Sequence, residues 1–201
     1  LAIRVVIAGS NVPPKPSTGP SVAPVTVEQE PAEFRGTGGL LRDIARSYAP
    51  DDLILVGNGA QILVQPLPTL ADELLRTGAE VAILAHRDGT PSGLFLVRCR
   101  IFESVPEVGF LDFKEQLLPR LAAAGVAIRV LQRNQASGYP VRTLDGYLAG
   151  LDAVARVRRG EPIQADPFAE DWESGFSIIE PGATVDPTAS VHNSVVLAGA
   201  A

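Results

Sequence analysis

Residues 35–40 read Arg35-Gly-Thr-Gly-Gly-Leu40, and residues 53–59 read Leu53-Ile-Leu-Val-Gly-Asn-Gly59. The first stretch opens a segment whose apolar residues recur at helical spacing, which predicts a helix capped by Thr37 and ended by Pro50. The second stretch is an aliphatic run closed by Gly-Asn-Gly, which predicts a buried strand. A helix followed by a buried strand is typical of α/β proteins.

The same alternation continues on both sides of these stretches. Further strands are predicted at residues 3–8, 25–28, 80–85, 93–99 and 126–131. Further helices are predicted after Thr69, Asp112 and Thr143, with Leu75 and Leu144 among their inward-facing residues. Because the elements alternate at short spacing, we expect a mostly parallel, Rossmann-like sheet with helices on both faces. Ligands of such sheets bind beyond the C-terminal ends of the strands.

The end of the chain falls into units of six residues. Aliphatic residues open each unit, at Ile179, Val185, Val191 and Leu197. This period is typical of a left-handed parallel β-helix, in which three units make one coil and the opening side chains point inward. We therefore predict an α/β domain over 1–159, a polar linker over 160–175 and the start of a β-helix over 176–201.

Both ends of the chain suggest a segment of a longer protein. Leu1 begins in the middle of an apolar strand, so the sheet is expected to be incomplete at its N-terminus. A solenoid needs about three or more repeats and a cap. The coil is therefore expected either to continue beyond Ala201 or to be covered by a neighbouring subunit.

Composition excludes several classes of function. The net charge is −6 without a run of Lys or Arg, which argues against binding of nucleic acid. No segment approaches the length of a membrane-spanning helix, and no signal peptide is present, so a cytoplasmic location without membrane contact is expected. The one cysteine, Cys99, lies in an apolar run and is interpreted as a buried structural thiol.

The order of several motifs resembles a known family. A strand, the Gly36-Thr-Gly-Gly39 helix start, the strand before Asn58-Gly59, and a helix carrying Glu115-Gln-Leu-Leu-Pro119 precede Thr143-Leu-Asp-Gly-Tyr-Leu148 and the terminal sixes. This order resembles the sugar-phosphate nucleotidyltransferases, and most of all their mannose-1-phosphate guanylyltransferase-like branch with a C-terminal β-helix. The resemblance covers residues 3–201.

The resemblance implies two sets of binding residues. The family's Leu-Gly-Thr-Ala-Gly element resembles residues 35–39, which implies that Gly36, Thr37 and Gly38 border the nucleotide. The family also has an acidic residue or Gln just upstream of this element. Glu30 is taken as its counterpart at the nucleotide, and Glu28 and Gln29 are the alternatives. The family's Asn-Gly-Asp element resembles residues 58–60, which implies a sugar site at Asn58 and Gly59, and we add Gly93 to it.

The departures from the family concern its chemistry. Its phosphate-binding loop would lie before Leu1, and Lys15 is interpreted as a chance match to its Pro-Lys-Pro element. Its two metal-binding aspartates correspond to Ala60 and, approximately, Pro140, which offer no side-chain oxygen to Mg²⁺. No catalytic residue and no metal ligand are therefore assigned.

Three hypotheses about function follow. The first is a catalytically impaired member of this family that binds a nucleotide or nucleotide-sugar. The second is an active enzyme, completed by upstream sequence, which would use Mg²⁺ to join a nucleoside triphosphate to a sugar 1-phosphate. The third is a hexapeptide-repeat acyltransferase with His192 as its base.

Homo- or hetero-oligomers are expected from the β-helix. Possible phosphate partners, interpreted first as surface charges, are Arg87, Arg98, Arg100 and Arg133.

Overall fold

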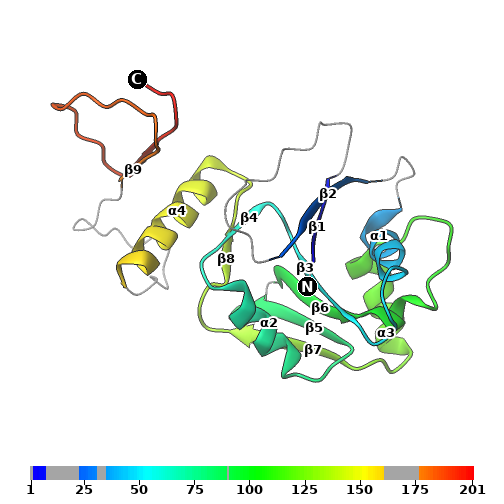
Figure 1. The fold of residues 1–201 in the computed structure, drawn as a ribbon. Coiled ribbons are helices and arrows are strands. Elements are labelled where there is room, and N and C mark those ends of the chain that lie inside the picture. Colours follow the sequence, from blue (N-terminus) through cyan, green and yellow to red (C-terminus); the bar gives the residue numbers. More distant parts are fainter. Residues whose placement is uncertain (1, 8–22, 31–34, 90, 161–176) are drawn as a thin grey trace. The chain divides into compact units, whose positions relative to one another are not determined.

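The computed structural model describes residues 2–7, 23–30, 35–89, 91–160 and 177–201 (Figure 1). Several expectations fall outside these residues: most of the loop at 11–24 with Lys15, and the expected linker from residue 161 onwards. The structure confirms the α/β class, because helices and strands alternate along the chain from β1 to α4. Within the described residues, no helix is long and apolar enough to cross a membrane.

The strands are β1 Ile3–Ile7, β2 Val25–Gln29, β3 Leu53–Gly57, β4 Gln61–Leu63, β5 Val81–His86, β6 Pro91–Arg98, β7 Ile128–Arg133, β8 Gly138–Pro140, β9 Ser177–Ile179 and β10 Ser194–Val196. The α-helices are α1 Gly36–Ala45, α2 Leu67–Leu75, α3 Leu118–Ala123 and α4 Leu144–Arg159. A 3₁₀ turn covers Cys99–Phe102, and a π-helical turn at Phe113–Leu117 leads directly into α3.

The strands form four separate sheets. The largest has the order β3-β6-β5-β7, and pairs are formed by β1 with β2, β4 with β8, and β9 with β10. Strands β1 and β2 run parallel, as predicted. Strand β6 departs from the prediction: Asn58 N donates to Gly93 O near one end of β3, and Cys99 N donates to Asp52 O near the other, so β3 and β6 run antiparallel. The connection from β5 to β6 is too short for a parallel crossover.

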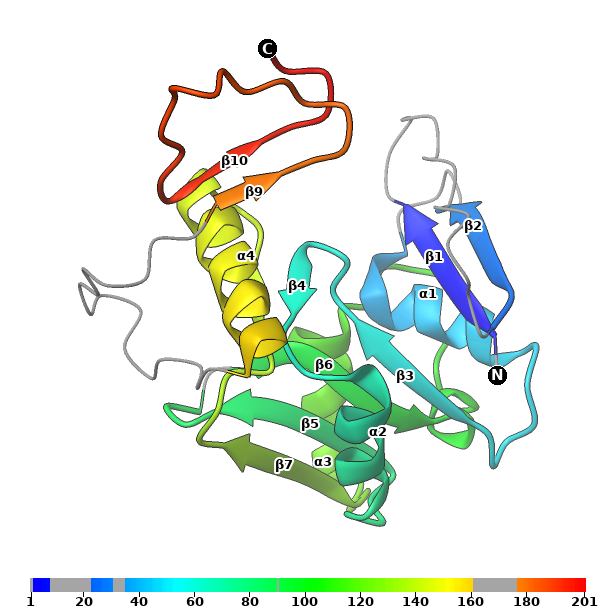
Figure 2. The same ribbon diagram turned by 60° about the vertical axis from the view of Figure 1, so that its left-hand side comes forward.

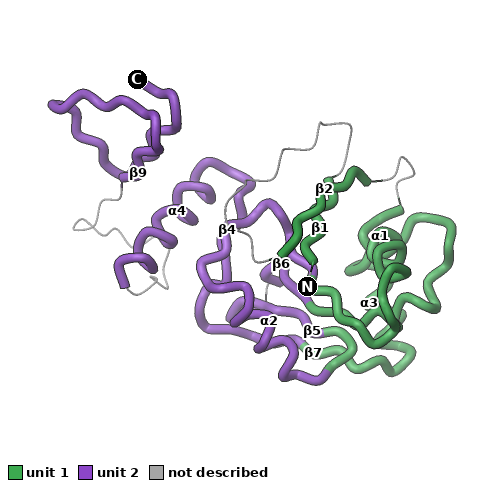
Figure 3. The backbone as a smooth tube through the Cα atoms, in the orientation of Figure 1, with its two compact units in different colours: residues 1–55, 79–81, 96–129 green, residues 56–78, 82–95, 130–201 purple. Residues whose placement is uncertain are grey.

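The chain divides into two compact units, each with its own core (Figure 3). One unit comprises residues 1–55, 79–81 and 96–129, and the other comprises 56–78, 82–95 and 130–201. In the first unit, the rings of Phe102 and Phe113 pack at a centroid distance of 6.5 Å and are both buried. In the second, Leu70, Leu74 and Leu84 are fully buried. Burial of such side chains stabilises each unit by about 1.5–3 kcal/mol per residue.

Two of the four predicted helix starts, those after Asp112 and Thr143, are confirmed, and each of these residues also caps its helix. Asp112 accepts hydrogen bonds from the backbone N–H groups of Lys114 and Glu115, and Thr143 accepts one from Gly146. The other two are wrong: α1 has Arg35 at its N-cap and α2 has Pro66, in each case without a side-chain cap. A proline at the second position of α2 already suits the helix start, since it lacks an N–H that would need an acceptor.

Two predictions of inward-facing side chains are also wrong. Leu75 is 45% exposed and Leu144 is 70% exposed. Both stand at the extreme end of their helix, Leu75 as the last residue of α2 and Leu144 as the first of α4. A terminal turn has no packed neighbour on one side, so an apolar residue there can match the period of the helix and still face water.

Residues 177–201 make one turn of chain that returns alongside itself (Figure 2). Strands β9 and β10 pair in parallel, with Val196 opposite Ile179. A strict period of eighteen would place Leu197 opposite Ile179, so the register differs by one residue from the prediction. Of the four opening side chains, Ile179 and Leu197 are about half exposed, whereas Val185 and Val191 are partly buried. Asn193, with φ of 48°, makes the left-handed turn that precedes β10.

Candidate functional site

The glycine-rich start of α1 packs closely against another segment of the same unit. Gly36 is buried with φ of +69°, and a Cβ atom there would lie 2.6 Å from the carbonyl oxygen of Leu111. The amides of Gly38 and Gly39 both donate to that oxygen, at 2.8 and 3.3 Å. The carbonyl of Leu111 therefore occupies two of the amides that begin the helix, and the glycines allow its approach.

Thr37 is held by Asp112, which lies 75 residues further along the chain. The hydroxyl of Thr37 donates to Asp112 Oδ2 at 3.0 Å and accepts from the backbone N–H of Phe113 at 2.9 Å. Hydrogen bonds from the Glu115 amide and from Thr37 hold the pKa of the Asp112 carboxyl below its ordinary value. From the sequence, Thr37 is predicted to cap one helix and Asp112 to precede another, and no local pattern indicates that the two residues contact each other.

The acidic residues upstream of α1 differ in their environment. Glu28 forms a bidentate ion pair with Arg4 of the neighbouring strand: Arg4 Nε donates to Glu28 Oε1 at 2.8 Å and Arg4 Nη2 donates to Glu28 Oε2 at 2.7 Å. That hydrogen-bonded partner lowers the pKa of Glu28. Glu30, just beyond β2, donates its backbone N–H to the carbonyl of Ile7 and is partly exposed. Of these two carboxylates, Glu28 is already engaged in holding two strands together.

The residues expected to form the sugar site belong to the second unit, where two of them meet. Asn58 donates its backbone N–H to Gly93 O at 3.0 Å, and its side-chain oxygen accepts from the N–H of Ala60 at 2.9 Å. Gly93 has φ of +80°, and a Cβ atom there would lie 3.3 Å from the Cβ of Asn58. Gly59 is exposed and has no close neighbour at the place a Cβ would take.

The two positions matched to the family's metal-binding aspartates lie close together: Ala60 directly precedes β4, and Pro140 is the last residue of β8, the strand paired with β4. Val141 N donates to Ala60 O at 2.9 Å, and Pro140 is the partner of Gln61 in the β4–β8 ladder. Ala60 and Pro140 bring no side-chain oxygen to this place. Across the described residues, no group of three or more His, Cys, Asp or Glu side chains could hold a metal ion. The side chains at these two positions therefore do not fit a carboxylate-bound Mg²⁺.

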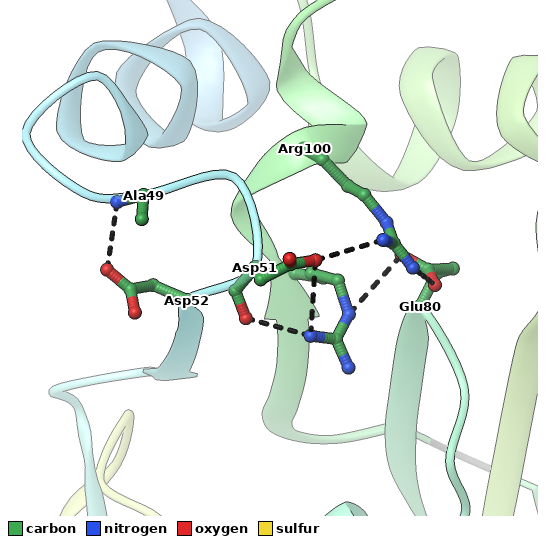
Figure 4. A network of polar contacts seen from close by, with 6 residues as sticks. Ala49, Asp51, Asp52, Glu80 and Arg100 are labelled. Carbon is green, nitrogen blue, oxygen red and sulfur yellow. Dashed lines mark hydrogen bonds and ion pairs between the residues drawn. The ribbon is translucent and has the colours of Figure 1, made fainter.

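The arginines considered as phosphate partners are mostly engaged with carboxylates. Arg100 bonds to Glu80 through two nitrogens and to Asp51 at 2.9 Å (Figure 4). Arg98 donates to the carbonyl of Asp51, and Arg133 lies 3.1 Å from Glu73. Arg87 is exposed at the end of β5.

The polar network around Arg100 connects Asp51, just before β3, with Glu80, just before β5. It joins the turn at residues 49–52 to Glu80, and Ala49 N donates to Asp52 Oδ2 within that turn (Figure 4). The hydrogen bond that Arg100 donates to the Glu80 carboxylate lowers the pKa of Glu80. We interpret the network as structural, since each guanidinium already faces an acidic partner.

Among the residues that the structure describes, two further candidates for chemistry, His192 and Cys99, have no activating partner. His192 is exposed, and its own carbonyl accepts from the Ser194 hydroxyl at 2.8 Å. Cys99 is 4% exposed, as expected for a structural thiol, and burial raises its pKa, followed by the nearby charge of Asp52. A raised pKa disfavours the reactive thiolate, so neither residue has the environment of a nucleophile or an activated base.

Comparison with known proteins identifies the fold. No family model matches the chain, and no curated protein matches it. Among solved structures, HddC from Yersinia pseudotuberculosis has a TM-score of 0.54 and 16% identity, over 74% of this chain and 77% of that chain. A second structure of that protein, complexed with GMP-PN, has a TM-score of 0.50 and 15% identity, over 70% of each chain. At this identity the likeness concerns the fold: the chain shares the α/β fold of HddC.

Proposed function

We propose that the chain is a sugar-nucleotidyltransferase-like protein that binds a nucleotide or nucleotide-sugar and lacks the metal-dependent transfer step. The fold shared with HddC, for which a complex with GMP-PN exists, supports nucleotide binding. Gly36, Thr37, Gly38 and Glu30 are the proposed nucleotide-binding residues, and Asn58, Gly59 and Gly93 the proposed sugar-binding residues.

The observation that carries the proposal is the neighbourhood of Ala60 and Pro140. Two ligands of one metal ion must lie close together, and these two positions are near each other: Ala60 precedes β4 and accepts from Val141 N, while Pro140 pairs with Gln61 of β4. This supports their correspondence to the family's two aspartates. Nucleotidyl transfer to a sugar phosphate relies on Mg²⁺ to neutralise charge as the α-phosphate is attacked. Since alanine and proline supply no ligand oxygen, we infer that binding is retained and transfer is lost.

The test measures binding and transfer on the same protein. With Mg²⁺, a panel of four nucleoside triphosphates and several sugar 1-phosphates, pyrophosphate release is expected to stay at background, while calorimetry detects binding of at least one nucleotide. The variant Glu30→Gln is expected to weaken that binding about tenfold, the effect of one lost charge-assisted hydrogen bond. Glu115→Gln, a matched change at an exposed position of the same unit, is expected to leave it unchanged.

Two results would contradict the proposal in different ways. Pyrophosphate release that a chelator abolishes and added Mg²⁺ restores would establish the active enzyme instead. Absence of binding for every nucleotide and nucleotide-sugar tested would remove the ligand class itself. The acyltransferase hypothesis gains no support from the exposed His192, and acetyl-CoA turnover lost in His192→Ala would be needed to revive it.

We also propose that residues 176–201 begin a left-handed β-helix that follows an α/β domain at 1–159 and a linker at 160–175. The parallel pairing of β9 with β10 after one turn of chain supports the coil. Exposed Ile179 and Leu197 on that coil support a role in assembly.

We therefore expect sedimentation velocity to show an oligomer of the full chain, and the double variant Ile179→Ser with Leu197→Ser to shift it towards monomer. An oligomer that is unaffected by the double variant would place the contact elsewhere.

A further inference from the structure

A cavity of about 260 Å³ lies within the first unit, at the C-terminal half of α1. Its walls come from α1, the turn that follows it, the 3₁₀ turn at Cys99–Phe102 and the segment up to Glu107. It lies at the other end of α1 from the glycines proposed to bind a nucleotide. Ligand sites commonly measure roughly 300–1,000 Å³, so this volume suits a small molecule.

A buried guanidinium forms part of the cavity wall. Arg42 is 3% exposed, and its Nε and Nη2 donate to Asp43 Oδ1 at 2.9 and 2.6 Å, while Nη1 donates to the carbonyl of Pro106. These bonds fix the orientation of the side chain. Each of the three guanidinium nitrogens is thus engaged once, and Nη1 and Nη2 each carry a second N–H, which the proposal below assigns to a ligand.

The cavity is lined by charged groups of both signs, Arg42 and Arg46 with Glu103 and Glu107. Arg42 is paired with Asp43, which does not line the cavity, and Arg46 forms an ion pair with Glu107. An anion would meet two carboxylates here, and a cation would meet two guanidinium groups. A neutral molecule with hydroxyl groups suits both, because each hydroxyl donates to a carboxylate and accepts from a guanidinium.

The remaining wall is apolar and aromatic. The ring of Tyr48 is 38% exposed beside the buried side chains of Phe102 and Val105. An aromatic face of this kind packs well against the C–H groups of a sugar ring, whose rim carries the hydroxyls. A cyclic polyol combines the two requirements of the cavity, with polar groups at its edge and an apolar face.

We propose that this cavity binds a small neutral cyclic polyol, either a free monosaccharide or a cyclitol. Arg42 and Glu103 hydrogen-bond its hydroxyl groups, and Tyr48 packs against its ring. The proposal is independent of the nucleotide site, because it uses none of the residues assigned there. It adds a second ligand site to the same unit.

The single cysteine of the chain makes a selective test possible. Cys99 lines the cavity and is the only thiol, and since it is 4% exposed, its alkylation requires local opening, which a molecule bound in the cavity opposes. D-glucose, D-mannose, D-galactose and myo-inositol are each titrated against the full chain, while the rate of Cys99 alkylation by N-ethylmaleimide and saturation-transfer NMR are recorded. We expect at least one of the four to give saturation transfer and to slow alkylation in a saturable manner.

Variants separate this site from others. Tyr48→Ala and Glu103→Gln are each expected to weaken the effective polyol about tenfold, as for the loss of one good contact. Glu115→Gln and Asn58→Ala are expected to leave the protection of Cys99 unchanged. The proposal is overturned if none of the four compounds gives saturation transfer, if the two cavity variants bind as the controls do, or if acetate or methylammonium protects Cys99 equally well.

Discussion

Gly36→Ala is expected to lower the free energy of unfolding by about 2–4 kcal/mol, the sum of left-handed backbone strain and overpacking. The strain arises because Gly36 has φ of +69°, where an L-residue is disfavoured. The overpacking arises because the new methyl group would lie 2.6 Å from Leu111 O and 2.8 Å from its carbonyl carbon. Both obstacles are backbone atoms, so relief requires movement of the 110–112 segment.

Two other glycines of the same unit separate these contributions. Gly109 has φ of +105° but no atom within 4 Å of the position that a Cβ would take, so Gly109→Ala introduces strain alone. In Gly38→Ala the new atom would lie 2.9 Å from Leu111 O without a positive φ, so it introduces overpacking alone. Urea unfolding followed by far-UV circular dichroism measures all three. If Gly36→Ala is no more destabilising than Gly109→Ala, then the Leu111 contact does not constrain α1.

This series also decides how loss of nucleotide binding should be interpreted. Sequence analysis assigned Gly36 and Gly38 to the approach of a ligand, whereas in the structure the carbonyl of Leu111 already approaches both. A glycine variant could therefore lose binding because α1 has shifted. Glu30→Gln, at a partly exposed side chain just beyond β2, avoids that ambiguity and is the better test of the nucleotide site.

What the sequence predicted well depends on contacts close along the chain. The helix starts after Asp112 and Thr143 were predicted, and the caps that the structure shows there are bonds to residues two or three positions away. The alternation of strands and helices is equally local, and it gave the α/β class. In each case the deciding interaction lies within one element or between neighbours.

What the sequence missed depends on distant contacts. Thr37 is of a residue type that caps helices, but α1 begins one residue before it, and its hydroxyl bonds to Asp112 and to Phe113 N. The turn at β5–β6 reverses the direction of β6, which the alternation alone did not reveal. Likewise, the cavity beside α1 joins Arg42 to residues 99–107, and no local pattern marks such a cluster.

Asp112→Ala is expected to lower the free energy of unfolding by about 1–2 kcal/mol, which combines a lost helix cap with the loss of the hydrogen bond from the exposed Thr37 hydroxyl. The carboxyl accepts from two backbone amides through Oδ1 and from Thr37 through Oδ2. Asp112→Asn keeps an acceptor at the cap and should be much milder, because asparagine caps helices about as well as aspartate. Glu115→Ala, also in the first turn, is expected to change stability by about 0.5 kcal/mol or less.

The same carboxyl adds a pH dependence whose sign follows from its lowered pKa. Hydrogen bonds from the Glu115 amide, from Thr37 and from the Lys114 amide stabilise the ionised form of Asp112 in the folded chain. Its contribution is therefore fully present above the ordinary aspartate pKa of about 3.9 and is lost as the pH falls through the lower folded-state value. Urea unfolding at a series of pH values should show a smaller acid-induced loss of stability in Asp112→Asn than in the unmodified chain. Equal losses in the two proteins would mean that Asp112 is not held in its ionised form by Thr37 and the helix start, and α1 would then be linked to residues 111–113 by the Leu111 carbonyl and by the bond from Phe113 N to the Thr37 hydroxyl.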